Sequence, residues 1–73
     1  MRLWIKDIDW NRISYTQEMI DESNIEDYCM WVENVAVVVQ SIDRDVISLL
    51  DRKGDLIVRI DSDAFSSMEV LGI

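Results

Sequence analysis

The sequence contains no histidine and no proline, and it has one cysteine and two glycines among 73 residues. The absence of histidine excludes a histidine general base, a Ser-His-Asp or Cys-His catalytic couple, and histidine metal ligands. Because Cys29 is alone, an intrachain disulfide and a thiolate zinc cluster are excluded as well. Two glycines are too few for a glycine-rich phosphate-binding loop. We therefore expect no cofactor and no enzymatic activity.

Long hydrophobic runs are also missing. The longest aliphatic run, Val35 to Val39, has five residues, far fewer than the roughly 20 that span a bilayer. Charged residues appear from Arg2 onward, too early for the apolar region of a signal peptide. A lone cysteine in a short chain is typical of a reducing compartment, and we expect Cys29 to be a small buried thiol. These features predict a cytoplasmic protein that binds no membrane.

The length and composition predict one small folded domain over residues 1–73. A chain of this size buries only about 60% of its unfolded surface, so its core is small. The hydrophobic fraction of 49% is nevertheless typical of globular proteins and too high for a disordered acidic tail.

Positive charge is scarce and unevenly distributed. Fifteen acids stand against seven bases, which gives a net charge of −8. Residues 13–43 contain no base and supply −7 of this total, through Glu18, Asp21, Glu22, Glu26, Asp27, Glu33 and Asp43. Such a charge opposes direct binding to nucleic acid or anionic lipid. The base-free block is the most informative feature of the sequence.

The same block carries helix signals. Ser14–Gln17 and Ser23–Glu26 both fit a capping box, and Ile25, Tyr28, Cys29 and Val32 recur at the spacing of one helical face. The sequence therefore predicts one or two short helices across about 15–33, with a break near 23–24. On such a helix, carboxylates three or four residues apart would lie roughly 5–6 Å from one another.

Strand signals dominate the rest of the chain. Residues 35–42 are rich in β-branched side chains and form a nearly continuous apolar run, which predicts a central strand buried on both faces. A second strand is expected at 46–50, and Asp51 and Gly54 fit a hairpin turn into an alternating strand at 56–61. A turn or single helical turn at 62–67 and a closing strand at 68–71 complete this meander.

The first fifteen residues leave two alternatives open after an expected strand at about 2–8. Either Asp9 caps a short helix, or residues 10–15 pair back as another strand. The predicted fold class is α+β, with an antiparallel sheet of four to five strands and one helical segment in the first half. The strand rhythm from residue 35 onward resembles that of small SH3-like barrels, without a family motif.

Three Asp-x-Asp pairs, at 7/9, 43/45 and 61/63, raise the question of a metal site. None continues into the roughly six oxygen ligands of a calcium loop, and each lies at an expected strand end, where Asp favours turns. We therefore expect no metal ligands. Catalysis by paired carboxylates is also not expected, because so small a domain has little depth in which to separate two pKa values.

Two functional hypotheses remain. The first is an acidic inhibitor that binds a basic, nucleic-acid-binding surface of another protein, since carboxylates on a helix would approximate the charge density of a nucleic-acid backbone. In size and charge the chain resembles the small acidic DNA mimics of phages and mobile elements. The candidate partner-binding residues are Glu18, Asp21, Glu22, Glu26, Asp27, Glu33, Tyr28 and Trp31. The two aromatics are included because such rings are enriched at interfaces.

The second hypothesis is a small barrel-like structural or regulatory subunit whose acids serve only solubility. It would bind a partner through tryptophan and valine surfaces or a sheet edge. Three tryptophans are many for a domain of this size, so a homodimer patch is a further interpretation.

Overall fold

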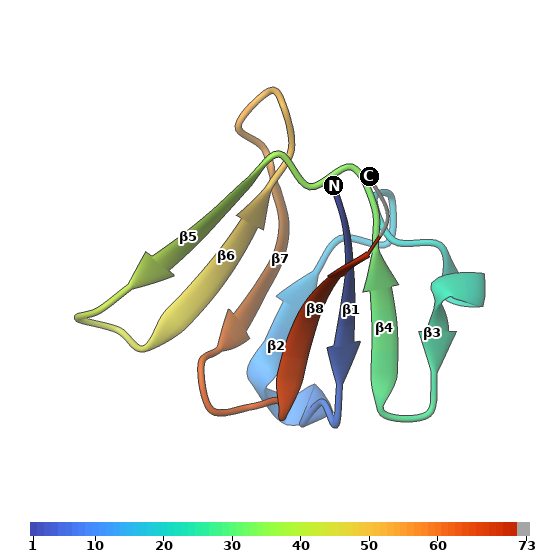
Figure 1. The fold of residues 1–73 in the computed structure, drawn as a ribbon, viewed down its shortest axis with the longest axis horizontal. Helices are drawn as coiled ribbons and strands as arrows, with labels where there is room; N and C mark the ends of the chain where they lie inside the picture. Colours follow the sequence, from blue (N-terminus) through green and yellow to red (C-terminus); the bar gives the residue numbers. More distant parts are fainter. Residues whose placement is uncertain (72–73) are drawn as a thin grey trace.

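The computed structural model describes residues 1–71 as two antiparallel sheets of four strands each (Figure 1). The strand orders are β3-β4-β1-β8 in one sheet and β2-β7-β6-β5 in the other. The elements are β1 (Arg2–Lys6), η1 (Trp10–Arg12), β2 (Ile13–Tyr15), η2 (Glu22–Asn24), β3 (Ile25–Glu26), β4 (Cys29–Val32), β5 (Val37–Ser41), β6 (Val46–Leu50), β7 (Leu56–Asp61) and β8 (Ser67–Leu71). The fold is nearly all-β, so the predicted α+β class with one four- to five-stranded sheet is wrong.

The helix predicted across 15–33 is replaced by a turn, the three-residue 3₁₀ helix η2 and the hairpin β3–β4. Along β4, Met30 and Val32 are buried whereas Cys29 and Trp31 are only half-buried, which is the two-residue period of a strand. Asp27, with φ of +49°, forms the left-handed turn of the hairpin. Pairing of β4 with both β1 and β3 has overridden the helix propensity of this segment.

The strand predicted at 35–42 exists as β5, but it is neither central nor buried. It pairs with β6 alone and forms one edge of its sheet. Four of its five residues are exposed, because no strand covers its outer side. In Figure 1 the β5–β6 hairpin also projects away from the sheet that contains β1 and β4. The β-branched composition predicted a strand correctly but not its position in the sheet.

The hairpin of β6 and β7 is confirmed, including its turn at 51–54. The Asp51 carboxylate accepts hydrogen bonds from the backbone N–H groups of Lys53 and Asp55, both at 2.9 Å. The Gly54 N–H donates to the Asp51 carbonyl at 3.0 Å, with Gly54 at φ of +86°. The side-chain and backbone oxygens of one aspartate therefore accept the hydrogen bonds that hold this turn.

The turn supports a stability prediction for Gly54→Ala. A Cβ at this position meets no atom within 4 Å, so the cost arises from the positive φ alone. We expect a loss of about 1 kcal/mol in the free energy of unfolding, measured by urea denaturation. Lys53→Ala, in the same exposed turn, is the control and is expected to change stability by less than about 0.5 kcal/mol. A neutral Gly54→Ala variant would contradict the left-handed turn.

Both alternatives for residues 9–15 are partly realised. Asp9 caps η1, with its carboxylate accepting from the Asn11 N–H at 3.1 Å, and β2 then pairs antiparallel with β7. Strands were also expected at about 2–8 and 68–71, and β1 and β8 occupy these positions and pair with each other. The pairing joins the two ends of the described chain in one sheet.

Both sheets contribute to one hydrophobic core. The buried residues are Leu3, Ile5, Ile8, Ile20, Met30, Val32, Val35, Leu49, Ile57, Val58, Ile60 and Ala64. Ile20 and Ala64 belong to loops and anchor those loops to the core. The anchoring of Ile20 fixes the path of the acidic segment around it.

Candidate functional site

Four of the predicted carboxylates surround one open hollow on the surface. Glu18, Asp21, Glu22 and Glu33 line it together with Gln17, Met19, Ile20, Asn24 and Asn34, and its volume is about 560 Å³. All four carboxylates are exposed. We call this site the acidic hollow. It brings Glu33 to residues 18–22, more than ten positions away in the sequence.

Local bonding explains how the acidic hollow is shaped. The backbone N–H groups of Met19 and Ile20 donate to the Thr16 carbonyl, and Ile20 is buried. The Asp21 carboxylate then accepts from the Ser23 N–H at 2.9 Å and caps η2. Hydrogen bonding to Ser23 lowers the pKa of Asp21 below its usual value. Asp21 is therefore held as an anion, and it has a structural task besides its charge.

A second feature lies beside Glu33. The Arg2 guanidinium is 3.3 Å from the Glu33 carboxylate and 4.2 Å from the centre of the Trp31 ring. Trp31 in turn packs against Trp4, with ring centres 4.3 Å apart. Arg2 therefore offsets part of the charge of Glu33. Within residues 1–71, no salt bridge reaches the other three carboxylates of the hollow.

The remaining predicted residues lie on the β3–β4 hairpin, away from the lining of the hollow. Glu26 ends β3, and Asp27 and Tyr28 form the turn. The carbonyls of Asp27 and Tyr28 accept from the Trp10 indole N–H at 2.8 Å and from the Ile8 N–H at 2.7 Å. Tyr28 remains 65% exposed. The structure thus leaves Tyr28 available for contact on a well-anchored turn.

The Trp31 side chain is less accessible to a partner than that of Tyr28. It is half-buried and already contacts Trp4 and Arg2. Cys29, two residues earlier on β4, is also half-buried, whereas a buried thiol was expected. Both side chains alternate with the buried Met30 and Val32 and therefore lie on the outer face of their sheet.

The predicted helix is absent from the acidic segment. The 5–6 Å spacing of carboxylates assumed a helix through residues 18–26, whereas this segment forms a turn, η2 and β3. The acidic hollow gathers charge through tertiary contacts instead. Sequence reasoning therefore missed that Glu33 joins Glu18 and Glu22 and that Arg2 contacts Glu33. No local periodicity links these positions, because the connection depends on sheet pairing.

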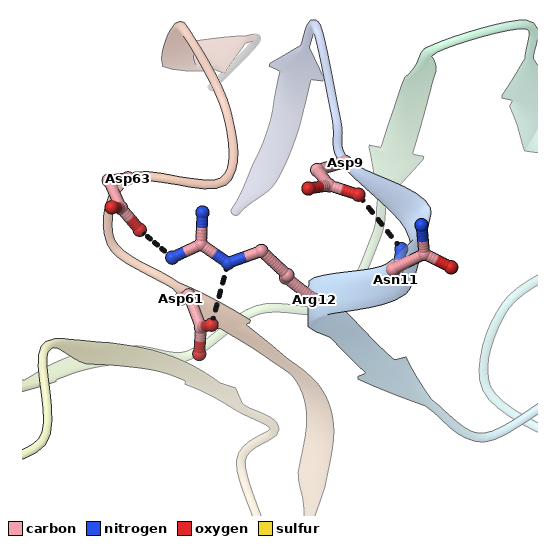
Figure 2. Close-up of polar contacts among 5 residues, drawn as sticks. All are labelled: Asp9, Asn11, Arg12, Asp61 and Asp63. Atoms are coloured by element: carbon pink, nitrogen blue, oxygen red, sulfur yellow. Dashed lines mark hydrogen bonds and ion pairs between the residues drawn. The ribbon is translucent and has the colours of Figure 1, made fainter.

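Another polar cluster contains Asp61 and Asp63, one of the three Asp-x-Asp pairs. Arg12 donates from Nε to Asp61 at 3.0 Å and from a terminal nitrogen to Asp63 (Figure 2). The hydrogen bond that Arg12 donates to Asp61 raises the pKa of Arg12 above its usual value. The cluster joins the end of η1 to the end of β7 and the turn that follows it. We interpret it as a structural clamp, because its charges already have partners.

Comparison with known proteins assigns no family or function to this chain. No protein-family model, curated protein or solved structure matches this chain. Over residues 1–71, no group of three or more metal-ligating side chains is present. The described helical segments are too short and too polar to cross a membrane. Four of the six predicted carboxylates line the acidic hollow, and it is the candidate binding surface considered below.

Proposed function

We propose that this protein is an acidic interaction protein that binds a basic surface of a partner protein through the acidic hollow. The observation that supports the proposal is the convergence of Glu18, Asp21, Glu22 and Glu33, from two separate segments, on one exposed surface. The lining residues include no lysine or arginine. Like charges held close together repel, so selection for stability alone would place bases among them.

The chemistry of the hollow favours a partner rich in lysine and arginine. Carboxylates accept charge-assisted hydrogen bonds from both side chains, and arginine forms two parallel bonds with one carboxylate. Asp51 extends the negative surface, because it lines an adjoining hollow together with Glu18 and Glu33. Clusters of lysine and arginine are typical of nucleic-acid-binding proteins. The proposed partner class is therefore a nucleic-acid-binding protein, and occupation of its basic groove would inhibit nucleic-acid binding.

The same proposal places the protein in the cytoplasm, where a nucleic-acid-binding target and a reducing environment for Cys29 are both found. The size and charge of small phage-type DNA mimics fit this role. The mimicry would rest on the grouped carboxylates of the hollow and not on regular helical spacing.

Salt dependence provides the first test. The protein is used to capture partners from a lysate at low salt, the captured protein is identified by mass and purified, and its Kd is measured by calorimetry. Between about 0.05 and 0.5 M NaCl we expect at least a tenfold loss of affinity, because screening shortens the reach of exposed charges. The nucleic acid that the partner binds should also compete. A salt-independent Kd would contradict the proposal.

A second candidate function is supported by a different observation. Val37, Val38 and Val39 are 48%, 43% and 43% exposed, and Ile42 is 87% exposed. These residues give the protein an apolar surface of the kind that a structural or regulatory subunit would use. Binding through this surface would survive 0.5 M salt and would fail when Val38 is replaced by lysine. The salt titration therefore separates the two functions.

A further inference from the structure

A second, smaller pocket adjoins the acidic hollow and shares Gln17, Ile20 and Glu22 with its lining. Its volume is about 250 Å³, and Tyr15 and Ile25 complete the lining. Tyr15 ends β2 of one sheet, and Ile25 begins β3 of the other sheet. We call this feature the side pocket. It lies between the two sheets, so its shape is set by the framework of the fold.

The side pocket combines apolar walls with a polar rim. Ile20 is 3% exposed, and Tyr15 and Ile25 are partly buried against the hydrophobic core. Gln17 and Glu22, in contrast, are exposed. Within residues 1–71 no salt bridge reaches Glu22, so its carboxylate is accessible to a cation from another molecule. A ligand that matches this lining has an apolar stem and a positively charged end.

We propose that the side pocket binds an arginine side chain of the basic partner. This inference rests on the proposed function and names the residue type that anchors the partner beside the acidic hollow. The methylene stem of the arginine packs on Ile20 and Ile25, because such stems cover apolar surface while the charged end stays accessible to water. The guanidinium donates two parallel hydrogen bonds to the Glu22 carboxylate.

The lining favours arginine over lysine for two reasons. A guanidinium is more weakly hydrated than an ammonium group and stacks on aromatic rings, and Tyr15 supplies such a ring. A guanidinium also has more N–H donors than an ammonium group, and Glu22, Gln17 and Tyr15 all carry oxygen atoms that accept hydrogen bonds. The carboxylates of the acidic hollow attract both cations. The side pocket therefore adds a preference for arginine to an attraction that depends on charge.

Hexa-arginine and hexalysine peptides test this preference, because the two probes carry equal charge. The Kd of each peptide for the full chain is measured by calorimetry in about 0.05 M NaCl. The wild type is expected to bind the arginine peptide about fivefold more tightly than the lysine peptide. Tyr15→Leu removes the ring and should reduce this ratio to about twofold or less. Tyr15→Phe keeps the ring and should retain most of the preference.

An exposed position provides a second test, because Tyr15 is partly buried. Gln17→Leu removes a hydrogen-bond acceptor from the side pocket without a change in charge, so the ratio of the two Kd values should fall. Gln40→Leu is the matched control, since it makes the same exchange at an exposed residue of β5, outside both the acidic hollow and the side pocket. Its ratio should equal that of the wild type. Circular dichroism and the melting temperature establish that each variant is folded.

Nuclear Overhauser contacts locate the bound arginine directly. They should join the δ-methylene protons of the arginine peptide to the Tyr15 ring and the Ile25 methyl groups. Contacts with another surface instead would overturn the proposal, as would a ratio that is unchanged in both Tyr15→Leu and Gln17→Leu. If the wild type binds both peptides equally and salt weakens both, the side pocket has no role and the proposed function stands. If it binds neither peptide at about 1 mM, both proposals fail.

Discussion

Replacing Met30 by alanine is expected to lower the free energy of unfolding by about 2–5 kcal/mol, whereas Tyr28→Ala should change it by less than about 0.5 kcal/mol. Met30 is 0% exposed, lies in the core cluster and pairs across to Ile5 and Ile25. Its truncation removes buried methylene groups and leaves a cavity between the sheets. Tyr28 is 65% exposed at a turn, and its backbone carbonyl, not its side chain, makes the anchoring hydrogen bond.

The measurement is urea denaturation followed by tryptophan fluorescence. Because a domain of 73 residues has a small core, the Met30→Ala variant is expected to be partly unfolded at 37 °C. Comparison of the two variants also distinguishes the observed hairpin from the predicted helix, because that helix would bury Tyr28 on the same face as Ile25 and Val32. A larger loss for Tyr28→Ala than for Met30→Ala would support the helix and contradict the structure.

The residues of this segment show why the fold class was mispredicted. Ile25, Cys29 and Val32 have the spacing of one helical face. Met30 and Val32, both in β4, have the two-residue spacing of one strand face, so the same short segment fits either structure. Short segments of this kind are decided by their neighbours. Here β1 supplies Leu3, Trp4 and Ile5 as cross-strand partners. That partner lies nearly thirty residues earlier, so a local pattern could not reveal it.

Where the deciding interactions were local, prediction succeeded. Asp51 and Gly54 specify a turn through their own hydrogen bonds and backbone angles, and the β6–β7 hairpin follows from that turn. Asp9 likewise caps η1 through a bond to Asn11, two residues away. Strand β5 shows the limit of local prediction. Valine favours strands in general, and whether a strand is central depends on what packs beside it.

The candidate site, too, could be predicted from the sequence only in part. Charge counting identified the acidic residues, because net charge needs no knowledge of the fold. It did not separate Glu18, Asp21, Glu22 and Glu33 from the hairpin pair Glu26 and Asp27, which lie outside the lining of the hollow. It also missed Arg2, which approaches Glu33 only because β1 pairs with β4. The distribution of the acidic surface is a property of the sheet pairing.

Reversing Glu18 and Glu22 to lysine together is expected to weaken binding of a basic partner by roughly 100-fold at low salt. Each reversal replaces attraction by repulsion in the lining of the acidic hollow, and neither side chain has a salt-bridge partner within the described residues. Asp21 is left unchanged because it caps η2. The Kd for the purified partner is measured by calorimetry in about 0.05 M NaCl, after circular dichroism has shown that the variant retains the wild-type fold.

The matched control reverses Asp43 and Glu69, which are exposed and lie outside the acidic hollow. Both double variants change the net charge from −8 to −4, so long-range attraction is weakened equally in the two proteins. In Figure 1 the turn that holds Asp43 lies at the opposite end of the molecule from η2. We expect the control to lose less than about tenfold in affinity, mainly through slower association. Equal losses in the two variants would mean that the partner responds to net charge alone, and the acidic hollow would then have no specific role.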